Sequence, residues 1–450
     1  MTAKFRREIA RGYFSCLDRK RGLFVNRALD RAVYNQTIPL DRLLADQESA
    51  AFAIAQYAWD EIDGYRSEFG RFDYKCFRQL PFLEKSLLIE SPDAFTAKKP
   101  GTIFYGSTSG STGKSLRFAY DAAHASWAEA CKLRGRTWYN VHRGDPVLVL
   151  WGRSVRTPSA GRKVLDRTKA YLRNELYFNT FASLDEPFLS EVAAGIGYHQ
   201  PKVIYGYGSS LAALGRYLFE RSPLVAPSKE RLLVQYTADH LGAADSKILE
   251  ESLGSMVVSD YGASEAPGIA FECPEGHLHI SVDCYKIEFL DQEGNEVPEG
   301  EIGDIVVTSL HNRAMPLIRY RIGDLGGPIN GSCSCGNTMP RMRLAVGKSI
   351  DTINTSFVKG VSSHYLDYIN IELMRRGDDG IAQFKVIQDG TDKFRLMVVA
   401  RKKGSAVDLG NFIHLLRDKI GPVEVNTELV QEIPREASGK HRYFVSVVKE

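Results

Sequence analysis

The residues with the clearest chemical potential form a loop rich in glycine, serine and threonine that ends in a lysine. Its glycines allow backbone N–H groups to converge on phosphate oxygens, its hydroxyls add donors, and Lys114 supplies a cation. A Walker A motif would need glycine at the position of Thr108, and the segment after Lys114 predicts a strand rather than a helix, which disfavours a P-loop kinase or GTPase. The loop predicts phosphate binding, and the plain alternative is a hairpin loop without a ligand. The candidate phosphate-binding residues are Ser107, Thr108, Ser109, Gly110, Ser111, Thr112, Gly113 and Lys114.

A second group of candidate residues has the chemistry of metal ligands. Cys273 and His279 fall in the segment ECPEGHLHI, and Cys333 and Cys335 form a Cys-Ser-Cys-Gly turn further along the chain. Three thiolates and one imidazole make the ligand set of a closed tetrahedral zinc site, which leaves no coordination position for a substrate and therefore has a structural role. His277 is an alternative fourth ligand, and unligated buried thiols are the alternative to a metal site.

The elements that must position these residues can be predicted from the periodicity of apolar residues. Helical spacing from about Arg11 to Tyr65 predicts a helical N-terminal lobe. The segments TIFYG and SLRFAYD predict strands on either side of the phosphate loop. DPVLVLWG and PKVIYGYG then predict short buried strands, with helices at HASWAEACKLRGRTW and SLAALGRYLFER, so the middle of the chain is of the α/β class.

The C-terminal part of the chain changes character twice. Alternation broken by turn residues between Tyr285 and Leu310 predicts antiparallel strands and a β-rich subdomain. After Gly347, two strands, an amphipathic helix and a closing strand predict a small α+β domain. We therefore expect a large domain over residues 1–346, with a helical lobe at 1–95 and binding sites at 96–346, and a small domain over residues 347–450.

The composition disfavours several classes of partner. The chain has 450 residues, of which 44% are hydrophobic and 25% charged, and its 58 basic residues nearly balance 55 acidic ones, for a net charge of +3. This weak, scattered charge favours small molecules over nucleic acid or an anionic membrane as partners. We expect a cytoplasmic location, because the sequence has no long apolar run and no secretory leader pattern. Seven cysteines are an odd number, so a disulfide framework is not expected.

Four motifs, taken in order, resemble the adenylate-forming (acyl-AMP ligase) superfamily, and within it the branch of phenylacetate-CoA ligases and CapK-like proteins. They are STSGSTGK at 107–114, DYGASE at 260–265, IRYRIGD at 318–324 and PREASGK at 434–440. Each motif alone also fits an ordinary turn, loop end or exposed lysine. Their order over most of the chain favours the family, whose fold joins a large adenylation domain, built of α/β sheets and a β-rich subdomain, to a small mobile α+β domain.

The resemblance implies roles for individual residues. In the family, an aromatic ring at the position of Tyr261 packs against adenine, a nearby hydroxyl lies by the phosphates, and the glutamate at the position of Glu265 binds magnesium. An aspartate of the third motif binds the ribose hydroxyls, and the segment TADHL contacts adenine. The implied catalytic residues are Glu265 and Lys440, and the implied nucleotide-binding residues outside the loop are Ala238, Asp239, Tyr261, Gly262, Ser264, Asp324 and Lys348.

The implied chemistry has two steps. A carboxylate is a poor electrophile, so it first attacks the α-phosphate of ATP and expels pyrophosphate, a step that needs magnesium, N–H donors and a lysine. The small domain then rotates about a hinge near Gly347, and the acyl group passes to a thiol such as coenzyme A. At this hinge Lys348 stands where the family has an arginine, and a lysine cannot make the arginine's bidentate contact. Ile350 stands where the family has an aspartate. Three alternatives therefore stay open. The acyl group could pass to an amine, the chain could adenylylate a cofactor, or it could bind a nucleotide without turnover.

The resemblance places the wall of the acyl site in the segment YGYGSS. It implies Tyr205, Tyr207 and Gly208 there, with Gly262 on a neighbouring loop. The ring of Tyr207 would stack on an aromatic acid, although core packing explains a tyrosine equally well.

Some relatives are also similar at the four Cys and His positions. The expected ligands are ATP, Mg²⁺, a structural Zn²⁺, a carboxylic acid and an acceptor such as coenzyme A or an amine, and a homodimer stays open.

Overall fold

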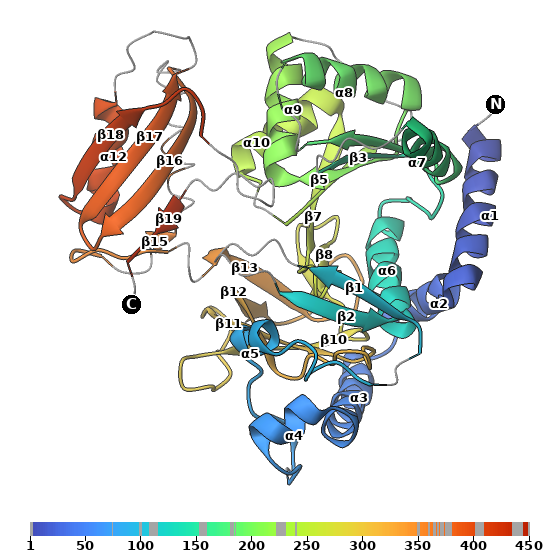
Figure 1. Ribbon diagram of the computed structural model, residues 1–450. Helices are drawn as coiled ribbons and strands as arrows, with labels where there is room; N and C mark the ends of the chain where they lie inside the picture. Colours follow the sequence, from blue (N-terminus) through green and yellow to red (C-terminus); the bar gives the residue numbers. More distant parts are fainter. Residues whose placement is uncertain are drawn as a thin grey trace. The chain divides into compact units, whose positions relative to one another are not determined.

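The computed structural model of the chain divides into two compact units, which are described separately (Figure 1). The first comprises Met1–Ile322 and Gly326–Arg343, and the second comprises Gly323–Leu325 and Leu344–Glu450. The structure describes residues 3–73, 75–98, 101–107, 116–152, 160–180, 184, 186–221, 231–238, 241–348, 352–358, 361–362, 366, 369, 373, 380–400, 409–433 and 444–448. Among these residues, no helix combines the length and the apolar character needed to cross a bilayer.

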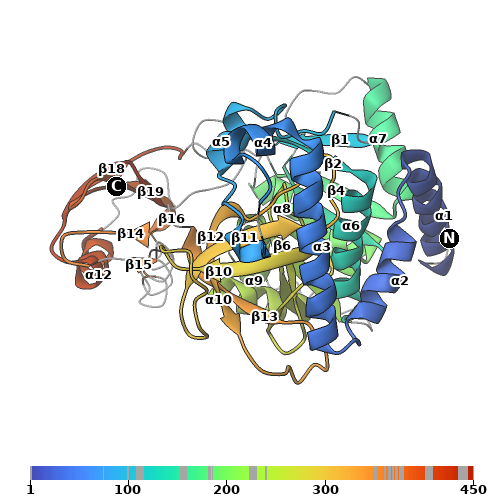
Figure 2. The same cartoon turned by 90° about the horizontal axis from the view of Figure 1, so that it is seen from below.

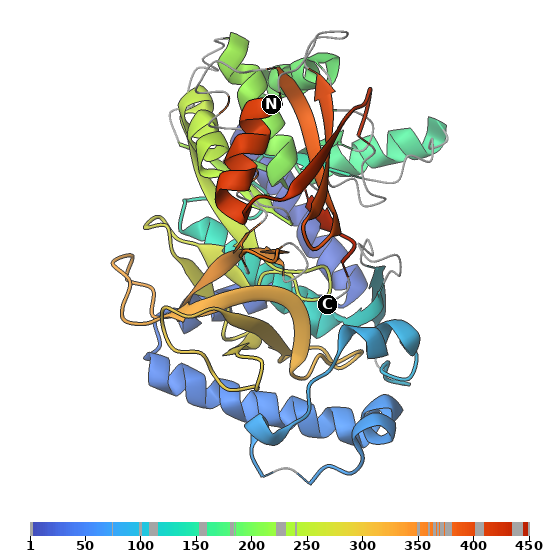
Figure 3. The same cartoon turned by 90° about the vertical axis from the view of Figure 1, so that its left-hand side faces the viewer.

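The N-terminal lobe is helical, as the periodicity predicted, and its first helix begins before Arg11. In α2, Val25, Ala28 and Ala32 are buried at helical spacing, and this stripe faces α6 (Figure 2). The long helix α3 lies against the antiparallel strands, where Gln47 donates hydrogen bonds to two backbone carbonyls (Figure 3). The elements are α1 (Ala3–Arg21), α2 (Val25–Asn35), α3 (Leu40–Glu61), α4 (Asp63–Phe69), the 3-10 helix η1 (Phe77–Gln79) and α5 (Lys85–Glu90).

Two short strands flank the predicted phosphate loop. Strand β1 (Ile103–Ser107) pairs antiparallel with β2 (Arg117–Asp121), as the sequence predicted. A Cβ at Gly106 would lie 2.3 Å from the ring of Phe118, so any larger residue would have to displace that ring. Asp121 then begins α6 (Ala122–Thr137) by accepting a hydrogen bond of 2.9 Å from the backbone N–H of His124.

Five parallel strands form one half of an eleven-stranded sheet. Their apolar side chains pack on α8, α9 and α10 in one cluster, and on the segment Trp138–Val141 just after α6 in a second cluster. The order across the whole sheet is β10-β11-β12-β13-β9-β8-β7-β6-β5-β3-β4. The parallel half comprises β3 (Val147–Trp151), β4 (Glu175–Asn179), β5 (Val203–Tyr207), β6 (Leu232–Thr237) and β7 (Ser255–Tyr261), with helices α7 (Ala160–Leu172), α8 (Glu186–His199), α9 (Gly208–Arg221) and α10 (Ala243–Leu253).

The antiparallel half of this sheet is the β-rich region that the sequence predicted. Tyr285 pairs with Ser309 and Leu290 with Asp304, in the antiparallel register of two strands joined through turns. The chain reverses at Gly294, whose φ of 85° favours glycine. The strands are β8 (Ala270–Glu272), β9 (Leu278–Ile280), β10 (Tyr285–Leu290), β11 (Gly303–Ser309), β12 (Tyr320–Ile329) and β13 (Arg341–Lys348).

The second unit is a small α+β domain. Its four-stranded sheet has the order β18-β17-β16-β19, and Phe384 of the sheet packs against Phe412 of the helix with ring centroids 5.2 Å apart. Sequence reasoning omitted β18, because its side chains are polar and mostly exposed. The elements are β14 (Thr352–Ile353), β15 (Val361–Ser362), β16 (Ile381–Gly390), β17 (Lys393–Ala400), α12 (Gly410–Ile420), β18 (Glu424–Leu429) and β19 (Phe444–Ser446).

Candidate active site and metal centre

The carboxyl ends of three parallel strands bring several predicted residues to one edge of the sheet. Tyr207 ends β5 and lies opposite Thr237, which ends β6. The hydroxyl of Thr237 donates a hydrogen bond of 2.7 Å to the backbone oxygen of Asp260, just before β7 ends at Tyr261. Ligands of open α/β sheets bind outside the carboxyl ends of the strands, so this edge is the candidate active site.

A tight turn after β7 presents the next predicted residues. The backbone groups of Ala263 and Ala266 bond to each other, at 3.0 and 3.2 Å. Gly262 admits no side chain, since a Cβ there would lie 2.7 Å from the backbone nitrogen of Gly268. The turn leaves Ser264 exposed and turns Glu265 inward, where only 3% of its surface remains exposed.

Glu265 is held by a cation and a hydroxyl from distant parts of the chain. The ammonium of Lys85, at the start of α5, lies 3.3 Å from Oε1, and the hydroxyl of Tyr320 donates to the same oxygen at 2.8 Å. Within the described residues, Oε2 makes no hydrogen bond. A buried carboxylate with one oxygen occupied and one available fits a magnesium ligand.

Arg319 fixes the two segments that reach Glu265. Its guanidinium pairs with buried Glu288 at 2.9 and 3.1 Å and donates to the carbonyls of Arg78 and Leu80 at 2.8 and 2.7 Å. Its backbone oxygen accepts from Leu83 at 3.1 Å, so the segment that leads into α5 is bonded to the start of β12. Arg319 has a φ of 46°, a conformation that this dense bonding must stabilise.

An aromatic cluster lines the same sheet edge. Tyr205 and Tyr207 extend from one face of β5, and Trp151 at the end of β3 stacks on both rings. The centroids of Trp151 and Tyr207 are 4.1 Å apart and their planes differ by 18°. Tyr207 is therefore a stacked and buried ring, with 6% of its surface exposed, rather than a lone platform. Sequence reasoning did not single out Trp151, although its place at the end of a predicted strand could have indicated it.

Lys85 and Tyr320 were also without an assigned role, although Tyr320 lies in the third of the four motifs. For the other predicted residues the structure describes less of the surroundings. Ser107 is exposed at the end of β1, Ala238 has a φ of 72° just after β6, and Asp324 is half-buried on β12 within the residues grouped with the second unit. Lys348 is described only as the last backbone position of β13. Thr108, Ser109, Gly110, Ser111, Thr112, Gly113, Lys114, Asp239, Ile350 and Lys440 lie outside the described residues.

The four predicted metal ligands come together between the β8–β9 hairpin and the turn at Cys333. Their ligand atoms all lie within 4.8 Å of one another. The sulfur atoms of Cys273 and Cys333 are 3.8 Å apart, and the sulfur of Cys335 is 3.3 Å from Nε2 of His279. Tetrahedral zinc with bonds of about 2.3 Å to sulfur would separate two thiolates by about 3.8 Å, so the donor set fits zinc.

The residue that completes this group of four is His279 rather than the alternative, His277. Nδ1 of His279 lies 2.8 Å from the carbonyl oxygen of Met339, which makes Nδ1 the hydrogen-bond donor and leaves Nε2 without a proton toward the thiols. Metal-bound histidines commonly have this outer hydrogen bond, because it fixes the ring and its tautomer. Nδ1 of His277 lies 3.5 Å from the sulfur of Cys333, but His277 is not in the group of four residues whose ligand atoms all lie within 4.8 Å of one another.

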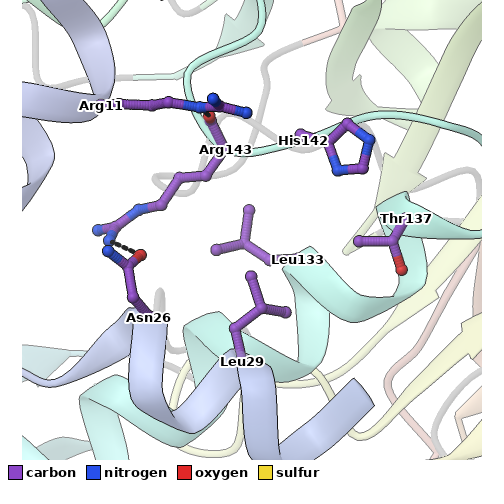
Figure 4. Close-up of a pocket in the computed structure, with 7 residues that line it drawn as sticks. All are labelled: Arg11, Asn26, Leu29, Leu133, Thr137, His142 and Arg143. Atoms are coloured by element: carbon purple, nitrogen blue, oxygen red, sulfur yellow. Dashed lines mark hydrogen bonds between the residues drawn. The ribbon is translucent and has the colours of Figure 1, made fainter. Parts of the chain in front are cut away.

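A cavity of about 230 Å³ lies between α1, α2 and α6, and none of the predicted residues lines it (Figure 4). Arg143 at its rim is paired with Asp18 at 2.6 and 2.9 Å and also bonds Asn26. This pairing compensates its charge, so the cavity is not an anion site by charge alone. Its lining residues are Arg11, Asn26, Leu29, Leu133, Thr137, His142 and Arg143.

Comparison with known proteins gives consistent relatives. The CapK C-terminal domain model matches residues 359–447. Protein CapK of Staphylococcus aureus is 23% identical over 385 residues, which cover 82% of this chain and 80% of that protein. A phenylacetate-coenzyme A ligase of Thermus thermophilus is 29% identical over 254 residues, covering 49% of this chain and 56% of that ligase. This chain therefore spans little more than half the length of the Thermus protein in that match.

Solved structures share the architecture. A 2-hydroxyisobutyryl-CoA ligase, crystallised in its postadenylation state with an acyl-AMP, superposes with a TM-score of 0.70 at 20% identity, covering 92% of this chain and 91% of that one. At this level of identity the match shows a common fold. The mixed α/β architecture with a small C-terminal sheet domain is thus that of adenylating enzymes, as the sequence predicted.

Proposed function

The chain belongs to the adenylate-forming ligase superfamily, in its CapK and phenylacetate-CoA ligase-like branch, and on this premise we propose that it activates a carboxylic acid with ATP. A carboxylate oxygen attacks the α-phosphorus, the bond to the β-phosphate oxygen breaks, and the products are an acyl-adenylate and pyrophosphate. The observation that carries this proposal is the buried Glu265 beside Lys85, at the edge where β5, β6 and β7 end. Glu265 would hold the magnesium ion, which when bound neutralises phosphate charge.

The remaining roles in adenylation follow from the motifs. By the motifs, Lys440 would act on the reacting carboxylate and α-phosphate, and residues 107–114 would supply N–H and hydroxyl donors to the phosphates. Tyr261 packs on adenine, and Asp324 accepts hydrogen bonds from the ribose. Preorganised charge of this kind is usually the largest catalytic contribution, and removing one such donor costs about 100 to 1,000-fold in rate.

The acid is aromatic in this proposal. Support comes from the wall of the site, where Trp151 and Tyr205, both partly exposed, stack beside the buried ring of Tyr207. Flat aromatic rings pack best on such surfaces, because offset stacking adds to the burial of apolar area. Phenylacetate-coenzyme A ligases among the relatives agree with this choice of acid class.

The acyl acceptor is a thiol such as coenzyme A. Its support is the coenzyme A ligases among the relatives. An amine is the second candidate, and the observation that favours it is the hinge sequence, where Lys348 and Ile350 depart from the pattern of the thioester-forming family. Residues 359–447 match the CapK C-terminal domain model, and this match also distinguishes the small domain from that of the thioester-forming family.

Zinc, in this proposal, has a structural role. Cys273 and His279 belong to the β8–β9 hairpin, while Cys333 and Cys335 belong to the turn between β12 and β13, so one ion ties two segments of the sheet together. Three thiolates and a histidine leave no position for a substrate. The ion would therefore stabilise the sheet that ends at the turn of Glu265.

The decisive test of adenylation is acid-dependent exchange of labelled pyrophosphate into ATP. A panel of aromatic and aliphatic carboxylic acids is assayed with the wild-type chain and with Lys440→Ala. We expect exchange with a small set of acids and its loss in the variant. If no acid supports exchange while ATP still binds, the chain is a nucleotide-binding protein without turnover. Product analysis with coenzyme A and with amines, using the active acid, then identifies the acceptor.

A further inference from the structure

Lys85, the first residue of α5, holds an ammonium group that is partly open to solvent beside the buried Glu265. Nζ of Lys85 lies 3.3 Å from Oε1 of Glu265, and the exposed fractions of the two side chains are 39% and 2%. An ammonium has three N–H donors. Within the described residues, the Lys85 ammonium bonds to Glu265 alone. Donors of Lys85 are therefore left for a ligand that approaches from the solvent side.

The backbone that carries Lys85 is anchored to the strand that also positions Glu265. Two residues before Lys85, Leu83 is fully buried, and its N–H and its carbonyl form hydrogen bonds, each of 3.1 Å, with the residues before and after Tyr320. Tyr320 itself donates to Oε1 of Glu265, the oxygen that Lys85 approaches. The ammonium is thus delivered to Glu265 from a segment bonded to β12, rather than from a loose surface loop.

The same short helix borders the hairpin that carries the predicted phosphate loop. α5 lies beside β2, the strand that follows the loop. Ser107 at the end of β1 pairs with Arg117 at the start of β2, so the hairpin brings the two ends of the loop together. α5 therefore adjoins two parts of the proposed phosphate site: it contacts the turn of Glu265 through Lys85 and borders the hairpin through β2. We expect a polyphosphate that reaches both parts to lie near the ammonium.

The chemistry of adenylation gives a cation here a use. When the bond from the α-phosphorus to the bridging oxygen breaks, the electron pair stays on that oxygen and pyrophosphate takes up negative charge. A positioned ammonium stabilises charge that develops in this way. We propose that Lys85 binds the phosphates that leave as pyrophosphate, donating to an oxygen of the β- or γ-phosphate while it stays paired with Glu265. This inference rests on the proposed function.

The alternative is that Lys85 serves only as the counter-ion of Glu265. In that role it would influence the nucleotide solely through the carboxylate and the magnesium ion that the carboxylate holds. A direct contact differs in two ways. It strengthens the binding of ATP but not of AMP, which lacks the outer phosphates, and it persists when magnesium is absent.

Calorimetric titration with ATP and with AMP tests the contact, because neither measurement needs the identity of the acid. Each nucleotide is titrated with magnesium and in magnesium-free buffer without a chelator, so that the zinc site is left undisturbed. The proteins are wild type, Lys85→Met, Lys85→Arg and the control Lys247→Met, which removes an exposed lysine that lies 3.9 Å from Glu251 on α10.

The expected result is a selective loss of ATP affinity. In Lys85→Met the Kd for ATP should rise by on the order of tenfold or more in both buffers, because a charge-assisted hydrogen bond to phosphate is lost. The Kd for AMP should stay at the wild-type value. Lys85→Arg keeps the charge and should retain part of the ATP affinity, and Lys247→Met should retain all of it.

A double variant covers the case in which Lys85→Met fails to fold, since that variant leaves Glu265 as a buried charge without its partner. Glu265→Gln replaces the carboxylate by an amide that needs no counter-ion. In magnesium-free buffer, Lys85→Met combined with Glu265→Gln should bind ATP more weakly than Glu265→Gln alone, and AMP equally well. Equal ATP affinities of these two proteins would overturn the contact.

The outcomes also separate this contact from the proposed function. If Lys85→Met weakens ATP and AMP equally, or weakens ATP only when magnesium is present, Lys85 is a counter-ion of Glu265 and adenylation is left standing. A wild-type chain that binds neither nucleotide overturns the proposed function, and the role of Lys85 with it.

Discussion

The hydroxyl of Tyr320 donates a hydrogen bond of 2.8 Å to Oε1 of Glu265, and both side chains are almost completely buried. The first residue of β12 thereby fixes a carboxylate on the turn that follows β7. The bond leaves Oε2 as the oxygen that can reach a metal ion. Tyr320 is a positioning residue in the proposed reaction.

Replacing Tyr320 by phenylalanine should weaken magnesium-dependent activity while the fold persists. A hydrogen bond to a charged group contributes about 1.5 to 3 kcal/mol, so the magnesium concentration for half-maximal exchange should rise by on the order of tenfold or more. The measurement is pyrophosphate exchange against magnesium concentration. Tyr57→Phe is the matched control, because that hydroxyl donates to a backbone carbonyl, of Arg313. An unaltered magnesium dependence in Tyr320→Phe would remove the positioning role.

The buried pair of Arg319 and Glu288 should dominate the stability of the segment that carries Lys85. Arg319→Met leaves Glu288, 4% exposed, as an uncompensated charge, which typically costs about 3 to 5 kcal/mol. The free energy of unfolding from denaturant titration measures it. Arg78→Met removes an exposed pair with Glu296 and should cost less than about 1 kcal/mol. Equal costs for the two variants would contradict this assignment.

The zinc assignment predicts a linked loss of metal and stability. The wild-type chain should carry about one zinc per molecule, and Cys333→Ser should lower both the zinc content and the melting temperature, because metal binding contributes to folding. Elemental analysis and thermal denaturation measure the two quantities. Cys16→Ser, at an exposed cysteine, is the control. The zinc site is wrong if Cys333→Ser changes neither quantity.

Buried His124 predicts a fall in stability on the acid side of neutrality. Burial, and then repulsion from His311, lower the pKa of His124 from 6.5 to about 4. Below pH 6.5 the unfolded chain takes up a proton that the folded chain refuses until the pH nears 4. The free energy of unfolding should therefore fall by about 1.4 kcal/mol per pH unit across this window. Burial also lowers the pKa of His311, which adds to the fall.

Unfolding measured between about pH 7 and pH 4 provides the check. His124→Gln should make the acid-side slope shallower, since glutamine takes up no proton. His414→Gln, at an exposed position of α12, should keep the wild-type slope. If the slope of His124→Gln matches that of the wild type, the buried histidine is not a source of the acid dependence.

Local features were predictable because they depend on neighbouring residues. Short apolar runs predicted β3 and β5, and the turn residues between β10 and β11 predicted their antiparallel pairing. The grouping of Cys273, His279, Cys333 and Cys335 was also predicted, since thiols and an imidazole are typical zinc ligands, but the sequence left His277 open as the fourth member. β18 escaped prediction because its exposed polar side chains show no buried stripe.

The sequence by itself thus indicated the family and most of the helices and strands in their order, and it nominated candidate residues for nucleotide and metal binding. Only the tertiary structure decided which groups meet. Glu265 faces Lys85 and Tyr320 from 180 and 55 residues away, Trp151 covers Tyr207, and the hydrogen bond from His279 to Met339 favours His279 over His277. The physical reason is that motifs and periodicity report the local chain, whereas these contacts depend on the strand order of the sheet and on the packing of α5 and α6, which no short window of sequence contains.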